Sequence, residues 1–519
     1  MSSTIALDDK AGSATMPRMP PQIPYIIANE GCERFSFYGM RNILTVFLMT
    51  SLLLAVPENL RKGEAKEVFH TFVIGVYFFP LLGGWLADRF FGKYRTILWL
   101  SVVYCCGHAC LAMFESSIPG FYTGLFLIAL GSGGIKPLVS SFIGDQFDKS
   151  NRSLAQKVFD AFYWIINFGS FFASLLMPIF LEKFGASVAF GIPGVLMAIA
   201  TLCFWSGRHK YVHLEPGARD PHGFLPVVRT ALASGTKGKV FAGLGLLLSV
   251  GALCLTPQVG IVAALCMVLV FMLGFGGIGA WVQLDAARRV HPAEAVEGVR
   301  SVLRLLVLFA LVTPFWSLFD QKASTWVLQA DQMSKPEWFK SSMMQALNPM
   351  LVMILIPFNN LVLYPALQKA GLKLTALRRM GAGIALSGLA WIVVGMLQLW
   401  LDDKHEVSIV WQVLPYAILT LGEVLVSTTG LEFAYSQAPL AMKGVIMSFW
   451  SLSVTIGNLW VLLSNSSVQS PSVVASISGT GLSTTAFLMF FFAGFALVAA
   501  SLFGLYARGY RMQDNYRTS

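Results

Sequence analysis

Ionisable side chains lie inside apolar stretches of this sequence, and the densest set lies near the amino terminus. Its members follow one another at offsets of 0, 3, 4, 8 and 11 residues, and they are Glu30, Glu33, Arg34, Tyr38 and Arg41. At about 100° per residue these positions share one stripe of an α-helix. An acid beside a base can form an ion pair that opens when the acid is protonated, which is the chemistry that proton coupling requires. A purely structural ion pair fits the same pattern.

Other polar and ionisable side chains are spread over the later apolar stretches. In the first half of the chain they are His70, Tyr77, Lys136, Tyr163 and Asn167, and in the second half they are Trp316, Asp320, Asn348, Glu423, Ser427 and Trp450. The first half thus carries an excess of cations, and the second half carries acids. A cavity with opposite charges on its two walls suits a zwitterion such as a peptide. Taken singly, Trp, Tyr and Asn in membrane helices are also common as packing or interfacial groups.

The composition indicates what kind of scaffold must hold these side chains. Of the 519 residues, 55% are hydrophobic and only 12% are charged, and the mean hydropathy is +0.66. Ordinary soluble domains do not have this balance. Because about 20 apolar residues cross a bilayer core of about 30 Å as a helix, the repeated long apolar stretches predict a bundle of membrane-spanning helices.

The apolar stretches predict fourteen spans in the order six, two, six. The first six lie near residues 24–55, 67–88, 96–114, 119–141, 158–182 and 186–206. A tight pair follows near 240–255 and 259–284, and the last six lie near 305–329, 343–368, 380–401, 408–433, 444–465 and 481–507.

Two six-helix halves joined by a basic connection are the layout of the major facilitator fold, in which the halves rock about a midplane cavity. We therefore predict an all-α membrane protein with two six-helix bundles and an inserted two-helix hairpin that packs outside them. The expected divisions are a cytoplasmic tail (1–22), an N-terminal bundle (23–207), a cytoplasmic linker (208–239), the hairpin (240–290), a C-terminal bundle (291–508) and a second tail (509–519).

The net charge of +10 raises the question of nucleic acid binding. Most Lys and Arg residues fall in the loops, tails and span ends that this topology places in the cytoplasm, as the positive-inside rule requires. The charge therefore indicates orientation, with both termini cytoplasmic in the inner (plasma) membrane, and no nucleic acid partner. The polar first 22 residues lack the apolar core of a signal peptide, so we expect a cytoplasmic tail.

The sequence indicates no metal site, no cofactor and no enzyme. All seven cysteines lie in predicted spans, without the clustered spacing of a disulfide framework. Cys105, Cys106 and Cys110 lie close together but have only His108 beside them, so we expect inert buried thiols. The glycines before Lys136 lie inside a span, where they favour close helix packing and not phosphate binding. A membrane enzyme would need a nucleophile motif or a metal cluster, and we find neither.

Five motifs together resemble the proton-coupled oligopeptide transporters of the major facilitator superfamily, bacterial type. Glu30-Gly-Cys-Glu33-Arg34-Phe-Ser-Phe37-Tyr38-Gly is similar to that family's ExxERFxYY signature on its first helix. The motifs that resemble those of helices four, five, seven and ten are Gly131-Ser-Gly-Gly-Ile-Lys136-Pro137, Phe162-Tyr163-Trp164-Ile-Ile-Asn167-Phe-Gly-Ser170, Phe315-Trp316-Ser-Leu-Phe319-Asp320-Gln321 and the segment from Glu423 to Pro439. The resemblance spans nearly the whole chain, and the hairpin is a feature of the bacterial members.

The resemblance implies a proton-driven importer of di- and tripeptides that works by alternating access, and it implies a role for each matching residue. The proton-coupling residues would be Glu30, Glu33, Arg34, His70, Lys136 and Asp320. Arg41 would pair with Asp320 as an extracellular gate, and Lys136 would contact Glu423 across the two halves. The peptide site would be lined by Arg34, Tyr38, Arg41, Tyr77, Lys136, Tyr163, Asn167, Trp316, Asn348, Glu423, Ser427 and Trp450.

Two positions depart from the family pattern. Phe37 stands where the family usually has a Tyr, which removes one hydroxyl, and Ser132 replaces the commoner Thr. Neither change removes a charge. A relative of the same fold that carries nitrate or another anion is the nearest alternative, but such a carrier has little use for an amine-binding acid at Glu423. The expected partners are a di- or tripeptide, protons and membrane lipid, with the chain working as a monomer.

Overall fold

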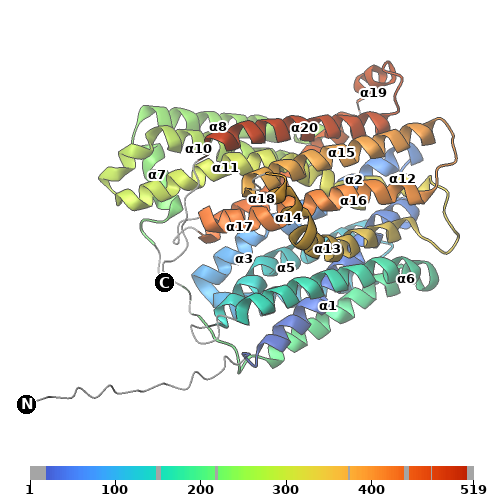
Figure 1. The fold of residues 1–519 in the computed structure, drawn as a ribbon, viewed down its shortest axis with the longest axis horizontal. Helices are drawn as coiled ribbons and strands as arrows, with labels where there is room; N and C mark the ends of the chain where they lie inside the picture. Colours follow the sequence, from blue (N-terminus) through green and yellow to red (C-terminus); the bar gives the residue numbers. More distant parts are fainter. Residues whose placement is uncertain are drawn as a thin grey trace, which may run out of the picture.

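The computed structural model describes residues 19–147, 154–214, 216, 220–371, 375–437, 443–468 and 470–510. Every element named in these residues is a helix. Figure 1 shows most of the long helices lying side by side, with α1 beginning and α20 ending on the left of the view. The helical architecture agrees with the prediction of an all-α bundle.

The N-terminal half contains the first helices in chain order. They are α1 (Ile23–Phe47), η1 (Leu48–Leu52), α2 (Glu58–Phe78), α3 (Pro80–Leu86), η2 (Ala87–Phe91), α4 (Gly92–Met113), α5 (Ile118–Asp145) and α6 (Ala155–Ser206). The backbone of α6 leaves helical geometry at Gly185, whose φ of 79° suits glycine. This break falls between the predicted spans 158–182 and 186–206, so α6 comprises two helices. They are folded against one core together with α1, α2, α4 and α5.

The C-terminal half has more breaks within its helices. Its elements are α11 (Ala293–Asp320), η5 (Gln321–Ala323), α12 (Thr325–Asp331), η6 (Ser341–Ala346), α13 (Leu347–Phe358), η7 (Asn359–Leu363), α14 (Tyr364–Lys369), α15 (Ala376–Asp402), η8 (Ile409–Gln412), α16 (Val413–Glu423), η9 (Val424–Thr428), α17 (Thr429–Gln437), α18 (Lys443–Ser467), α19 (Pro471–Ser478) and α20 (Thr484–Gly509). The segments η7 and η9 are π-helical, which alters the helical spacing where they occur.

The linker and the hairpin form a separate layer beside the C-terminal half. The hairpin consists of α8 (Thr236–Cys254), the short turn α9 (Thr256–Val259) and α10 (Ile261–Gln283), followed by η4 (Leu284–Arg289). The linker contains an amphipathic helix that the sequence did not predict, α7 (Phe224–Ala233). It buries Phe224, Val227 and Ala231 where it packs against α10, η4 and α11. Figure 1 shows α7, α8 and α10 together at the upper left.

Ten stretches of the described chain are long and apolar enough to cross a membrane. Two of them, Glu58–Met113 and Ala161–Ser206, each cover all or nearly all of two predicted spans. The helices α1 and α18 are predicted spans outside these ten. The protein is thus a multi-pass membrane protein, while the count of fourteen spans and the domain boundaries stay predictions.

Close contacts at glycines fix the position of α5, which carries Lys136. A methyl group on Gly83 of α3 would lie 2.2 Å from the Gly134 carbonyl oxygen, and one on Gly133 would lie 2.5 Å from the Val76 carbonyl oxygen. Such distances admit no side chain at all. The glycines before Lys136 therefore permit close helix packing, as the sequence predicts.

We expect the Gly83→Ala variant to be less stable, because α3 and α5 must separate to admit the methyl group. Overpacking of this kind costs about 1–3 kcal/mol. Thermal unfolding of the purified protein in detergent measures the effect. Gly84→Ala is the matched control, because a methyl group there meets nothing within 4 Å. Equal melting temperatures for the two variants would contradict this account of the contact.

Candidate functional site

An ion-pair cluster occupies the buried face of α1. The Arg34 side chain pairs with Glu30, one helical turn earlier, and its Nε lies 3.2 Å from Glu33 Oε2. Glu30 and Glu33 are 1% and 2% exposed. A single guanidinium thus holds two buried carboxylates, as their shared helix face indicated.

Lys136 lies near this cluster but uses an aromatic ring. Its Nζ lies 3.4 Å from the centre of the Phe37 ring and 5.4 Å from that of Tyr77. A cation over an aromatic face is attracted by the negative face of the ring. Phe37, which departs from the family pattern, thus supports the cation without a hydroxyl.

A second network joins the two halves. Arg41 Nη2 on α1 donates to Asp320 Oδ1 on α11 at 2.6 Å, so the two expected partners are in contact. Asn458 Nδ2 on α18 donates to Asp320 Oδ2 at 2.8 Å, and Asn458 Oδ1 lies 2.5 Å from His70 Nδ1 on α2. His70 Nε2 lies 3.0 Å from the Ser324 hydroxyl. The network links α1, α2, α11 and α18 through buried side chains.

The amide of Asn458 fixes the direction of these hydrogen bonds. Because Nδ2 donates to both Asp320 and the Val454 carbonyl, the carbonyl oxygen Oδ1 must face His70. An amide oxygen only accepts, so His70 Nδ1 carries the proton. Nε2 of a neutral ring then accepts from Ser324, whereas a protonated ring donates to it. Both protonation states of His70 therefore find partners in this arrangement.

The spanning helix that carries Asp320 is interrupted next to it. The helix α11 ends at Asp320, η5 follows, and Ser324 has φ −124° and ψ −75° before α12 begins. Irregular backbone at membrane depth is tolerated where it is buried in protein or lines a cavity. Within this break Lys322 is 5% exposed, and its Nζ lies 3.4 Å from the centre of the Phe319 ring without a hydrogen-bond partner.

Glu423 lies on the C-terminal half. Asn348 Nδ2 on α13 donates to Glu423 Oε2 at 2.5 Å and to Thr420 Oγ1 at 3.1 Å. Glu423 is the last residue of α16, and the π-helix η9 with Ser427 begins directly after it. Such π-helical turns are frequent at functional sites. Asn348 thus orients the one acid that the sequence assigned to a substrate amine.

The remaining predicted side chains surround these charges. The Trp316 and Trp450 rings meet edge to face with their centres 6.0 Å apart. Trp450 packs closely on Gly430, where a methyl group would lie 2.2 Å from the indole. Tyr163 is 39% exposed, and its backbone carbonyl accepts from Asn167 Nδ2 at 3.0 Å. Tyr38, Tyr77 and Ser427 are partly exposed.

The expected contact between Lys136 and Glu423 is absent from the described structure. No hydrogen bond or ion pair joins the two described side chains. The physical reason is that each charge finds a partner within its own half, Lys136 over Phe37 and Glu423 with Asn348. Lys136 and Glu423 therefore lie on different halves and do not neutralise each other.

Contacts between the halves concentrate on one side of the membrane. Besides the network at Asp320, Thr45 Oγ1 donates to the Ala323 carbonyl at 3.0 Å and Gln345 Nε2 donates to the Asn42 carbonyl at 3.1 Å. Asn465 Nδ2 donates to the Gly63 carbonyl at 3.1 Å. Under the predicted topology this side is extracellular, so the described structure is closed there.

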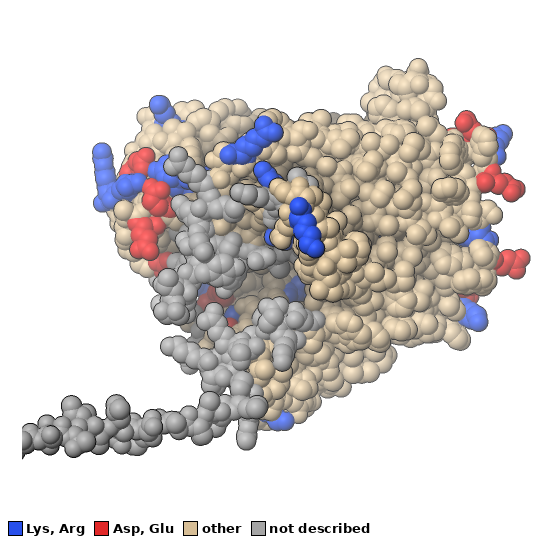
Figure 2. All heavy atoms as spheres, viewed as in Figure 1, with Lys and Arg blue, Asp and Glu red and all other residues tan. Residues whose placement is uncertain are grey.

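The surface view agrees with a membrane location. Charged side chains lie over the left half and at the right end of the molecule in Figure 2, and a broad tan band between them, right of the centre, shows none. Left of the centre, blue and red atoms are also visible deeper in the molecule.

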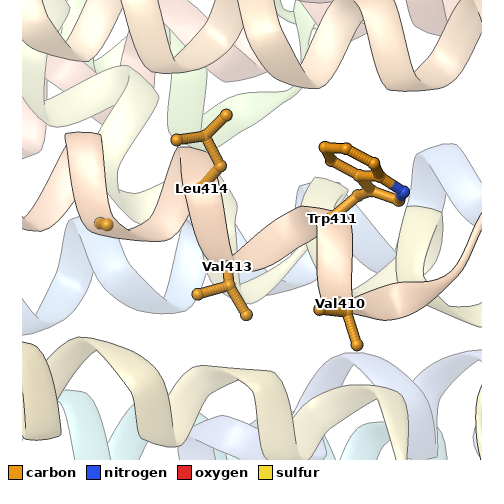
Figure 3. Close-up of a pocket in the computed structure, with 5 residues that line it drawn as sticks. Val410, Trp411, Val413 and Leu414 are labelled. Carbon is orange, nitrogen blue, oxygen red and sulfur yellow. The ribbon is translucent and has the colours of Figure 1, made fainter.

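A surface pocket of about 480 Å³ lies elsewhere, at the start of α16. Figure 3 shows Val410, Trp411, Val413 and Leu414 lining it. Val410 is 68% exposed and Trp411 54%, and the lining carries no charged side chain. An exposed apolar groove of this kind in a membrane protein suits lipid and has nothing to bind a zwitterion.

The sequence interpretation gave no role to two residues of this site. Asn458 connects His70 to Asp320, and Lys322 places a buried cation beside the same acid. A polar amide within the apolar span 444–465 was the available signal for Asn458. Lys322 was visible as a charge within span 305–329, but nothing in its spacing assigned it a partner.

Comparison with known proteins places this chain in a family. The profile of the POT family matches residues 94–480. This chain belongs to the POT family. A crystal structure of the POT family transporter PepTSo is 69% identical, with a TM-score of 0.94, over 96% of this chain and 100% of that one. A structure described as an auto inhibited POT family peptide transporter is 63% identical, with a TM-score of 0.93, over 96% and 99% of the two chains.

Curated relatives are more distant and longer. Peptide transporter 3 of Caenorhabditis elegans is 32% identical over 77% of this chain and 54% of its own length. Solute carrier family 15 member 2 of Homo sapiens is 30% identical over 80% of this chain and 54% of its own length. The chain thus spans about half the length of the curated relatives it matches. The POT family is a family of transporters and not a class of enzymes, and its members have the predicted major facilitator fold.

We expect the Arg41→Gln and Asp320→Asn variants of this POT family chain to lose stability non-additively, because either change alone leaves a buried charge without its partner. Side chains in direct contact show coupling energies of about 0.5–3 kcal/mol. A double-mutant cycle on unfolding in detergent, together with peptide uptake, measures the coupling. Arg41→Gln combined with Glu182→Gln, an exposed acid paired with Lys340, is the control. If the losses of the two single variants simply added in the double variant, Arg41 and Asp320 would not act as a functional pair.

Proposed function

We propose that this chain is a proton-coupled symporter that imports di- and tripeptides across the inner (plasma) membrane by alternating access, with both termini in the cytoplasm. The observation that carries the proposal is the separation of opposite charges between the halves. Arg34 and Lys136 lie on the N-terminal half, Glu423 lies on the C-terminal half, and no ion pair joins Lys136 to Glu423 in the described residues.

A short peptide carries one charge of each sign at its two ends. Its carboxylate suits Arg34 and Lys136, and its amine suits Glu423, so a bound peptide connects the two walls. Trp316, Trp450 and Tyr163 supply apolar and aromatic surface for the side chains of the peptide. An inorganic anion has no group for Glu423, which disfavours the alternative of an anion carrier. The names of the relatives, which describe peptide transporters, support the same substrate class.

Proton coupling follows from the cluster on α1. Arg34 holds the ionised Glu30 and Glu33, and a substrate carboxylate competes for the same guanidinium. Binding of peptide therefore favours proton uptake by these acids, and the two binding events are thermodynamically linked. A membrane potential near 100 mV then supplies about 2.3 kcal/mol for each net charge carried inward. This is enough for more than tenfold accumulation, since a factor of ten corresponds to about 1.4 kcal/mol.

The network at Asp320 gives the closed extracellular side its dependence on protons. Its members Arg41, Asp320, Asn458 and His70 come from both halves, so the Arg41–Asp320 and His70–Asn458 contacts must break when that side opens. Protonation of Asp320 weakens its attraction to Arg41, which favours opening. We propose that His70 acts through Asn458 on the same acid. Lys136 belongs with the α1 cluster, where its charge adds to that of Arg34. The chain contains a complete set of these groups, so we propose a monomer as the working unit.

The Glu423→Gln variant tests the assignment of the peptide amine. We expect it to weaken binding of a free-amine dipeptide by about tenfold or more, because a hydrogen bond to a charged group contributes about 1.5–3 kcal/mol. Affinity for the N-acetylated dipeptide should stay unchanged. Competition against uptake of a labelled dipeptide gives both affinities, with Glu406→Gln, an exposed acid, as the control. Unchanged affinity for both ligands would show that the amine binds elsewhere.

Uptake into proteoliposomes tests the transport reaction itself. The wild-type chain should concentrate a labelled dipeptide when a proton gradient is imposed, and should fail to do so without one. We expect Glu30→Gln and Glu33→Gln to abolish this accumulation while sparing peptide-for-peptide exchange, because exchange needs only alternating access. If both variants still concentrated the dipeptide, proton coupling would have to reside elsewhere, with His70 as the next candidate.

A further inference from the structure

The outer end of the inserted hairpin packs against both halves at once. A buried apolar cluster contains Ile74 from α2, Ala263 and Cys266 from α10, and Leu459 and Leu462 from α18. Its members are between 1% and 7% exposed. The helix α2 belongs to the N-terminal half and α18 to the C-terminal half, so α10 covers the seam between them.

This cluster lies directly beside the hydrogen bond that closes the seam. Ile74 follows His70 by one helical turn on α2, and Leu459 is the residue after Asn458 on α18. The turn that begins α10 also meets α2, because a methyl group on Gly260 would lie 3.3 Å from Glu67 Oε1. Gly260 has φ 82°, which lets the chain reverse tightly at this contact.

The inner end of the hairpin is fixed to the C-terminal half. The helix α10 packs there against α7, η4 and α11. A methyl group on Gly277 would lie 3.7 Å from Leu303 of α11, and Gly279 lies close to Leu232 of α7. Figure 1 shows α7, α8 and α10 grouped beside α11 at one end of the molecule. The hairpin is therefore attached along its length to one half and meets the other half near its tip.

We propose that the hairpin is a strap carried by the C-terminal half, whose tip holds α2 in place and favours the state closed on the extracellular side. The proposal rests on the alternating access of the proposed function. Opening that side separates His70 from Asn458, so α2 must also leave α10 at Ile74. A hairpin that only faced lipid would have no need to share a buried cluster with both halves.

Crosslinking through the native Cys266 tests the strap. The other six cysteines are replaced by Ala, and either Ile74→Cys or Leu462→Cys is added, so that a short reducible bis-thiosulfonate joins α10 to α2 or to α18. We expect the crosslink to α2 to block dipeptide uptake and a reductant to restore it. The crosslink to α18 should leave uptake unchanged, since both helices move with the same half. Full uptake with α2 crosslinked, or equal block by both crosslinks, would overturn the proposal.

A second measurement follows the closed state without a crosslink. Ala323→Cys in a background without native cysteines places a thiol at the closed seam, where residue 323 is 1% exposed. In this background we add Ile74→Ala. We expect it to raise severalfold the rate at which an impermeant maleimide, added from outside, labels the thiol at position 323. The control is Leu265→Ala on the exposed face of the same α10, where the side chain is 54% exposed. Equal labelling rates for the two variants would overturn the strap. Absence of peptide uptake by the wild-type chain and by the reduced variants alike would instead count against the proposed function.

Discussion

A charge buried in the bilayer core costs several kcal/mol unless it is paired or faces a cavity, and this cost determines how the helices of the chain are arranged. Arg34 is balanced by two carboxylates on its own helix. Arg41 is balanced by an acid on the other half. Lys136 and Lys322 each lie over an aromatic ring. These four buried cations thus have three different kinds of partner, and each kind permits a different change when a proton or a ligand arrives.

Some of the buried charges have partners within their own half, and others have partners on the opposite half. These two groups of charges are suited to different roles. Arg34, Lys136 and Glu423 have partners within their own halves, so the halves can move apart without stripping these charges. The same charges can therefore be offered to a ligand from opposite walls. Arg41 and His70 have partners on the other half, and under the proposed alternating access those contacts break when the closed side opens. One set of buried charges is thus suited to bind a zwitterion, and the other to hold a seam that responds to protons.

The sequence predicted an all-helical bundle and the shared face of the α1 side chains, because both depend on periodic signals. The stripe from Glu30 to Arg41 is periodic, and the structure brings Arg34 into contact with both acids and Arg41 into contact with Asp320. What the sequence could not predict depends on long-range geometry. The bond from Asn458 to His70 joins residues 388 positions apart. The amphipathic helix α7 was missed because its short apolar face lies within a polar linker. The Lys136 contact was assigned to Glu423 because charge alone cannot reveal that an aromatic ring and an amide lie nearer.

The interruption after α11 connects the two sets of charges. Asp320, Lys322 and Ser324 all lie within or beside the turn η5, and their side chains reach Arg41, the Phe319 ring and His70 respectively. In an unbroken α-helix, residues 320 and 322 would point about 200° apart and their surroundings would be independent. The break allows one short segment to contact the seam, the aromatic wall beside Trp316 and the histidine. A shift of this turn when Asp320 loses its hold on Arg41 therefore moves Lys322 and Phe319 with it. Under the proposed function, a change of charge at Asp320 reaches the aromatic wall beside Trp316 in this way, without any helix having to unfold.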